Sequence, residues 1–201
     1  MADNGGMFTP LPLEGADLSW DPAWLEEEAA TALFAGLQAQ VPWGTHRIRL
    51  FGRWVDSPRR SCWIGDPGAS YRYSGAQFEP HPWPEVLGPL RERLAAELGG
   101  PFNSVLANLY RDGDDAMGWH ADDEPELGSA PVIASLSLGQ PRRFLLKHRR
   151  DAARRLALTL APGSLLVMAG RTQAEFVHAL PRSRRAPGPR INLTFRRILP
   201  G

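Results

Sequence analysis

The segment at residues 103–110, NSVLANLY, opens a series of short strand-like runs that determines the fold class. Turn-forming stretches, such as DGDD at 112–115 and APGS at 161–164, separate these runs. The runs that follow are PVIASLSLG (131–139), RRFLLKH (142–148), RLALTLA (155–161), SLLVMAG (164–170) and RINLTFRRI (190–198). Many short strands joined by turns, with few helices, predict a β-sandwich, barrel or jelly roll.

The first hundred residues have a different texture. Residues 1–17 are rich in Gly and Pro and have no periodicity, which predicts a flexible N-terminal arm. A helix should follow, with Asp21 as its cap and Pro22 in its first turn, and it should end at Pro42. Residues 46–55 alternate like a strand with a Gly break.

A second helix is predicted from about Pro84 to Leu98, where Gly99 and Gly100 stop it. The length of 201 residues fits one domain with a sizeable core. Cys62 is the single cysteine, so no internal disulfide can form, and a reducing compartment fits. We find no signal-peptide pattern and no run near the roughly 18–20 apolar residues of a membrane span. We therefore expect a soluble, cytoplasmic protein that contacts no membrane.

Charge is distributed unevenly along the chain. Residues 1–139 carry 9 Lys and Arg against 20 Asp and Glu, whereas residues 140–201 carry 14 against 2. Lys147 is the single lysine among these cations. An arginine-rich segment suits a nucleic-acid backbone, although a solvated charged face explains the pattern equally well.

A candidate metal site lies in Trp119-His120-Ala121-Asp122, with His178 following 58 residues after His120. On an extended segment, residues i and i+2 point to the same side, so His120 and Asp122 can face one ion. A second histidine from a distant strand completes a two-histidine, one-carboxylate face, which suits non-haem Fe(II). The motif alone is weak, because a core histidine and a surface aspartate produce the same pattern.

The last strand-like run has one apolar and one polar side. Polar side chains at alternate positions form a stripe able to bind a short dicarboxylate, and they are Arg190, Asn192, Thr194 and Arg196. Asn108 and Tyr110 add further groups that can bind carboxylate oxygens. A strand with one solvated face would look similar.

At these residues the chain resembles the AlkB family of DNA-repair dioxygenases, over roughly residues 46–199. The resemblance rests on residues 108–128, 131–139, 162–170, 178–181 and 189–198, which read NLYRDGDDAMGWHADDEPELG, PVIASLSLG, PGSLLVMAG, HALP and PRINLTFRRI. It implies a mainly β fold with flanking helices: a double-stranded β-helix (jelly-roll) core over 101–201. It also implies helices and an N-terminal nucleotide-recognition lid over 18–100, within one dioxygenase domain over 18–201.

The resemblance also implies the chemistry. Fe(II) would be held by His120, Asp122 and His178. The cosubstrate 2-oxoglutarate would be gripped by Arg190 and Arg196, with Asn108, Tyr110 and Thr194 assisting. O₂ oxidises 2-oxoglutarate to succinate and CO₂, an N-linked methyl group is hydroxylated, and formaldehyde leaves; ascorbate can keep the iron reduced.

Family likeness extends to the base pocket. The damaged base must leave the stack to reach the iron. Tyr71, Tyr73 and Ser74 match the family's lid, and Tyr73 is placed to stack on the flipped base. Asp123 and Glu124 follow the metal ligand, where an acid can accept a hydrogen bond from the exocyclic amine of a methylated base. In an ordinary strand and an acidic turn these residues would have no such role.

A finer resemblance points to the branch of the family that prefers double-stranded DNA. Its hydrophobic finger matches Leu50-Phe51-Gly52, with Phe51 as the wedge between bases. Arg184 and Arg185 match a basic loop that touches the opposite strand. Arg59 and Arg60 are further candidate phosphate contacts.

The expected function is oxidative demethylation of N1-methyladenine and N3-methylcytosine in duplex DNA by a monomeric enzyme. The alternatives are the same chemistry on RNA or on a protein side chain, and a catalytically silent nucleic-acid-binding relative. The complete metal triad and both arginines argue against the silent relative.

Overall fold

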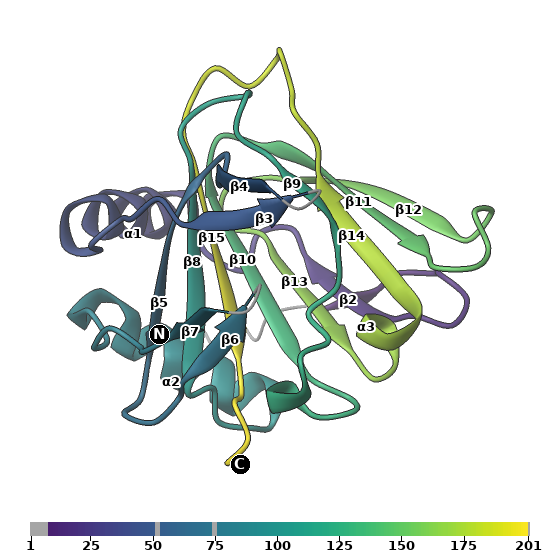
Figure 1. Ribbon diagram of the computed structural model, residues 1–201, viewed down its shortest axis with the longest axis horizontal. Helices are drawn as coiled ribbons and strands as arrows, with labels where there is room; N and C mark the ends of the chain where they lie inside the picture. The colour runs from purple at the N-terminus through teal and green to yellow at the C-terminus, as the bar shows by residue number, and fades with distance from the viewer. Residues whose placement is uncertain (1–7, 51–52, 74–75, 201) are drawn as a thin grey trace.

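The computed structural model describes residues 8–50, 53–73 and 76–200. In this part of the chain the larger sheet has seven strands in the order β1-β2-β13-β10-β15-β8-β5, and every neighbouring pair is antiparallel (Figure 1). Its strands are β1 Thr9–Pro10, β2 Asp17–Asp21, β5 Arg60–Gly65, β8 Ser104–Tyr110, β10 Ile133–Gly139, β13 Leu165–Ala169 and β15 Arg190–Arg196.

A smaller antiparallel sheet has the order β12-β11-β14-β9 within the described residues. Its strands are β9 Met117–His120, β11 Arg142–His148, β12 Arg155–Leu160 and β14 Phe176–Leu180. Two hairpins stand apart from both sheets, β3 Arg47–Leu50 with β4 Arg53–Asp56 and β6 Tyr71–Tyr73 with β7 Ala76–Phe78. Two opposed antiparallel sheets confirm the predicted jelly-roll class.

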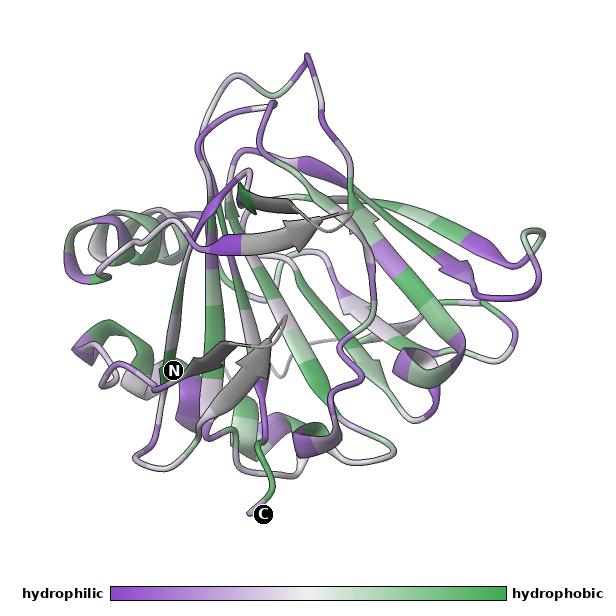
Figure 2. Ribbon diagram, viewed as in Figure 1, coloured by the Kyte–Doolittle hydropathy of each residue, from purple (hydrophilic) through white to green (hydrophobic). Residues whose placement is uncertain are grey.

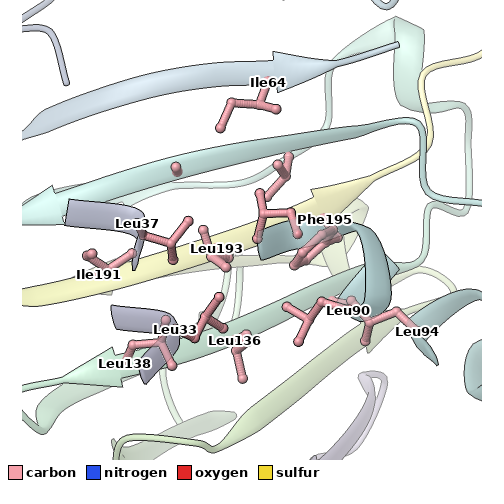
Figure 3. Close-up of a cluster of buried hydrophobic side chains, with 14 of the residues drawn as sticks. Leu33, Leu37, Ile64, Leu90, Leu94, Leu136, Leu138, Ile191, Leu193 and Phe195 are labelled. Carbon is pink, nitrogen blue, oxygen red and sulfur yellow. The ribbon is translucent and has the colours of Figure 1, made fainter. Parts of the chain in front are cut away.

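Two helices, α1 (Glu27–Gln40) and α2 (Gly88–Leu98), cover one face of the larger sheet. The chain forms α1 Glu27–Gln40, η1 Glu85–Leu87, α2 Gly88–Leu98, η2 Pro125–Leu127 and α3 Thr172–Glu175. Figure 3 shows Leu33 and Leu37 of α1, and Leu90 and Leu94 of α2, packing on the leucines and Phe195 of the sheet. Helix α2 ends at Gly99, which has the left-handed φ of 72° that glycine adopts readily.

Strand β15 separates the apolar core from the space between the sheets. Ile191, Leu193 and Phe195 belong to the cluster under the helices. The intervening polar residues therefore face the smaller sheet, because strand side chains alternate. A second apolar cluster, which includes Phe144, Met168 and Phe176, fills the rest of this space. Figure 2 shows the hydrophobic colouring along the strands and the hydrophilic colouring of the loops at the top.

Two features near the N-terminus differ from the sequence prediction. Part of the predicted arm is ordered, since β1 pairs with β2, and β2 pairs with β13 at the edge of the larger sheet. Asp21 is the last residue of β2. Its carboxylate accepts a hydrogen bond from the Ala23 amide, so it caps a turn and not a helix. Helix α1 begins later, at Glu27, because the Leu25 amide donates to the Gly163 carbonyl.

Candidate active site

The three predicted metal ligands come together between the sheets. His120 ends β9, His178 lies in β14, and the two are register partners. Asp122 follows two residues after His120. One donor atom from each side chain lies within 4.8 Å of the others, and the two imidazole centroids are 4.2 Å apart. This is the two-histidine, one-carboxylate donor set that suits Fe(II) and leaves positions open for other ligands.

Both imidazoles are held neutral, as a metal ligand must be. The Nδ1 atom of His120 is 2.8 Å from the Gly118 carbonyl. Because a carbonyl oxygen only accepts, Nδ1 carries the hydrogen and Nε2 keeps its lone pair for the ion. Burial lowers the pKa of His178 to about 3, and burial also lowers the pKa of His120. The buried Nδ1 atom of His178 has no hydrogen-bond partner among the described residues.

Two neighbours fix Asp122, one through its carboxylate and one through its backbone amide. Arg196 donates to Oδ1 of Asp122 at 2.6 Å, and the Asp122 amide donates to Gln173 at 2.9 Å. Burial alone would raise the pKa of Asp122, but the charge of Arg196 brings it below its usual value. Asp122 therefore stays ionised, and the three residues fit an iron ion by donor type, protonation and spacing.

One pocket contains both the metal triad and the predicted cosubstrate residues. Its lining includes Asn108, Tyr110, His120, Asp122, His178, Arg190, Asn192, Thr194 and Arg196. The two strands that supply most of the polar groups are adjacent, and Arg190 pairs with Tyr110 in register while Asn192 pairs with Asn108. Arg190 donates to Ser137 at 2.9 Å. The pocket thus offers a cationic and amide surface opposite the metal triad.

Hydrogen bonds between neighbouring strands hold the amides of this pocket. Asn192 donates to the Ser135 hydroxyl at 2.9 Å and to the Leu136 carbonyl at 3.0 Å, and its own carbonyl accepts from Thr194 at 3.2 Å. Arg59 donates to the Asn108 carbonyl at 2.7 Å. The side chains therefore present fixed faces to a ligand.

Comparison with known proteins agrees with this geometry. Residues 17–196 match the family model of the 2OG-Fe(II) oxygenase superfamily. The mouse protein "DNA oxidative demethylase ALKBH2" is 40% identical over 223 residues, which cover 98% of this chain and 93% of the mouse protein. The chain belongs to the AlkB family of 2OG-Fe(II) oxygenases. The human protein of the same name is 39% identical, over 97% of this chain and 78% of the human one.

A solved structure agrees with the fold of this AlkB-family member. "The structure of OsALKBH1" superposes with a TM-score of 0.66 at 16% identity, covering 94% of this chain and 99% of that one. Human "alkB homolog 3", an alpha-ketoglutarate-dependent dioxygenase, is 36% identical over 89% of this chain and 65% of its own length. Membership of the family establishes Fe(II) and 2-oxoglutarate as the cofactors, as the resemblance implied.

The predicted base-binding residues of this AlkB-family oxygenase are only partly placed. Phe51 and Ser74 lie outside the described residues. Tyr71 and Tyr73 lie in β6, where their backbones pair with Phe78 and Ala76. These four therefore stay predictions.

The two predicted acids lie directly after the metal ligand. Asp123 is half-exposed and forms a 2.5 Å ion pair with Arg149. Glu124 precedes the turn η2. Arg149 therefore limits the freedom of Asp123 to turn toward a base.

The predicted basic contacts have different outcomes. Arg184 and Arg185 are exposed in the loop after β14, as a strand-contacting loop requires, and Arg60 is exposed as well. Arg59 is not a phosphate contact, because only 6% of its surface is exposed and it holds Asn108.

No helix in the described residues has the length and apolar character needed to cross a membrane.

Sequence reasoning missed three organising residues. Gln173 binds the Asp122 backbone from 51 residues away, and no local pattern marks it. Arg59 supports Asn108, and its position in a turn-rich segment gave no sign of burial. Arg142 is buried in β11, and the alternation with Phe144 and Leu146 on the same face would have revealed it.

Proposed function

We propose that this chain is a DNA-repair dioxygenase that removes the methyl groups of N1-methyladenine and N3-methylcytosine, preferentially in duplex DNA. The observation that carries the proposal is the complete iron triad in a chain 39–40% identical, along nearly its whole length, to proteins named DNA oxidative demethylase. Fe(II), 2-oxoglutarate and O₂ supply the oxidising power at the methyl group. The protein supplies fixed ligands and a pocket that contains the metal triad and the cosubstrate residues.

The chain's own residues would divide the work as follows. His120, Asp122 and His178 hold the ion, while Arg196 keeps Asp122 ionised and correctly oriented. Arg190 and Tyr110 bind the cosubstrate carboxylate farther from the metal. The exocyclic amine of the flipped base would donate to Asp123, whose position depends on Arg149.

Two features support duplex DNA as the substrate. The β3–β4 hairpin has Leu50 and Arg53 as register partners, so a two-residue link that contains Phe51 joins the strands. Phe51 lies outside the described residues, and its apolar side chain stays the predicted wedge in a base stack. The exposed Arg184 and Arg185 lie next to the 111–116 loop, since the Ser183 amide donates to the Gly113 carbonyl, and they suit contact with phosphates.

The test is mass spectrometry of oligonucleotides that carry one N1-methyladenine or one N3-methylcytosine. Matched single-stranded DNA, duplex DNA and RNA forms are incubated with and without Fe(II) and 2-oxoglutarate. We expect each lesion to lose one CH₂ unit only when both are present, and faster in duplex DNA than in the other forms. Faster loss from RNA would overturn the DNA assignment. No loss in any form, with iron and 2-oxoglutarate bound, would move the substrate to a protein side chain or indicate a silent relative.

We also propose that the enzyme acts as a monomer in the cytoplasm. The single domain and the lone cysteine, Cys62, which fits a reducing compartment, support this proposal. Light scattering coupled to size exclusion should give a mass near 22.2 kDa, and twice that value would contradict it.

A further inference from the structure

Two consecutive arginines in β11 point to opposite sides of the smaller sheet. Arg142 is 2% exposed and faces the interior, whereas Arg143 is exposed on the outer surface. The alternation of a strand requires this arrangement. The pair therefore contains one arginine with an internal role and, beside it, a natural control.

The guanidinium of Arg142 is neutralised by no adjacent acid. It donates to the carbonyls of Asp112 at 2.9 Å, Asp115 at 2.8 Å and Pro181 at 2.8 Å. No ion pair within 4.0 Å joins it to a carboxylate in the part of the chain that the structure describes. The nearby Asp115 carboxylate is itself paired with Arg111. Carbonyl dipoles satisfy the N–H groups but leave the positive charge in place.

That charge lies behind the pocket wall. The Arg142 guanidinium carbon is 5.8 Å from the ring centroid of Tyr110, and that of Arg190 is 5.3 Å from the same ring. Tyr110 and Arg190 line the pocket, but Arg142 does not. Burial and, to a smaller extent, the charge of Arg142 lower the pKa of Arg190 to about 10. Both arginines remain protonated near neutral pH.

Arg190 and Arg196, at the two ends of the polar side of β15, make different contacts. Arg196 is committed to Asp122 beside the metal. Arg190, at the other end, pairs in register with Tyr110 and donates to the neutral Ser137 hydroxyl. Two buried cations around one phenol ring cost folding free energy unless an anion joins them. A carboxylate of the cosubstrate is the anion that enters this pocket.

We propose that Arg142 is a positioning residue for the carboxylate of 2-oxoglutarate that lies farther from the metal. Its guanidinium contacts the face of the Tyr110 ring, which lines the pocket, and adds a second buried positive charge to that of Arg190. Arg142 touches neither the metal nor the cosubstrate. Replacing Arg142 should therefore weaken the binding of the distal carboxylate of 2-oxoglutarate and leave the binding of its keto-acid end unchanged.

The experiment is calorimetric binding of two keto acids to the Fe(II)-loaded protein without O₂ or nucleic acid. The probes are 2-oxoglutarate and 2-oxopentanoate, which has the same chain length but no distal carboxylate. Arg142→Met should weaken 2-oxoglutarate binding about tenfold or more, and 2-oxopentanoate binding less than about threefold. Arg142→Lys keeps the charge but loses the planar fork, so it should weaken 2-oxoglutarate binding less than Arg142→Met does. Arg143→Met, the matched control, should leave both affinities unchanged.

Equal weakening of both keto acids in Arg142→Met would overturn the proposal, since it would indicate a general distortion of the site. Unchanged binding of both, or a loss in Arg142→Lys as large as in Arg142→Met, would also overturn it. Arg142→Gln serves as a second neutral variant, and circular dichroism with iron content checks each fold. If neither neutral variant folds, Arg142 is a structural residue and the proposal fails. Because no DNA is present, these outcomes are independent of the proposed repair function.

Discussion

Arg196 and Asp122 form a buried ion pair of 2.6 Å, with side chains that are 2% and 4% exposed. The pair joins the last strand of the larger sheet to the metal-binding segment beside the smaller sheet. The strand that lines the cosubstrate pocket therefore also fixes the carboxylate that binds the metal. Removing one partner leaves an uncompensated charge in the interior, and this has a measurable cost.

Arg196→Met should lower the free energy of unfolding of the metal-free protein by about 3–5 kcal/mol. Urea unfolding measures this loss. The double variant Asp122→Asn/Arg196→Met should lose less than the sum of the two single variants, because it leaves no buried charge unpaired. Arg197→Met, an exposed neighbour, should change the value by less than about 0.5 kcal/mol. Strictly additive losses would show that the two side chains are not coupled.

His178→Ala should abolish turnover because it removes one of three metal ligands. Fe(II) affinity, measured after stripping and resupplying the metal, should fall by more than the roughly 100-fold typical of losing an outer contact. His148→Ala is the control, since His148 lies outside the triad and its ring accepts hydrogen bonds from the backbone amides of Arg150 and Asp151. A His178→Ala protein with wild-type iron content and turnover would remove His178 from the site.

Phe51→Ala should slow demethylation of duplex DNA by about tenfold and leave single-stranded DNA nearly unchanged, because only a duplex needs a group to fill the gap left by the flipped base. Steady-state rates on matched oligonucleotides give the ratio. Val55→Ala, an exposed apolar residue of the same hairpin, is the control. The same reduction on both substrates would contradict the finger assignment.

Gly113→Ala should displace the basic loop. A Cβ at this position would lie 1.8 Å from the Ser183 carbonyl oxygen, a backbone atom that cannot move alone. We expect about 2–4 kcal/mol of destabilisation and weaker binding to duplex DNA, measured by thermal unfolding and fluorescence anisotropy. Gly100→Ala is the control, because its Cβ would have no neighbour within 4 Å. Wild-type stability and affinity in Gly113→Ala would mean that the loop of Gly113 and the loop of Ser183 separate at little cost in free energy.

The Cys62 thiol should be inert in the folded protein. Burial raises the pKa of Cys62 to about 11, and only 1% of the residue is exposed. At pH 8 roughly 0.1% would be the reactive thiolate, and that fraction rises as the pH approaches 11. A disulfide reagent should therefore label Cys62 at pH 8 only after urea is added. Rapid labelling without urea would show that β5 opens readily.

Alternation along strands made the core of the site predictable. The pattern of β15 placed its four polar residues on one face, and the structure puts all four in the pocket. The family motifs supplied the three metal ligands. The same alternation applied to RRFLLKH would have placed Arg142 inside.

Contacts between distant segments could not be read from local patterns. Gln173 and Asp122 meet because α3 packs beside the metal segment, which depends on the whole fold. Arg59 looked like a surface cation, but β5 pairs with β8 and brings it to Asn108. Asp21 has the composition of a helix cap, yet pairing with Leu165 draws it into a strand. Tertiary pairing outweighs local preference in each case.

The chain order of the metal ligands has a consequence for protein synthesis. A ribosome delivers His120 and Asp122 first, and His178 emerges 58 residues after His120. Until then a nascent chain holds two ligands of three, and Arg190 and Arg196 come later still. An iron centre able to activate O₂ is therefore assembled only after β14 and β15 have been made, which spares the growing chain from its own oxidant.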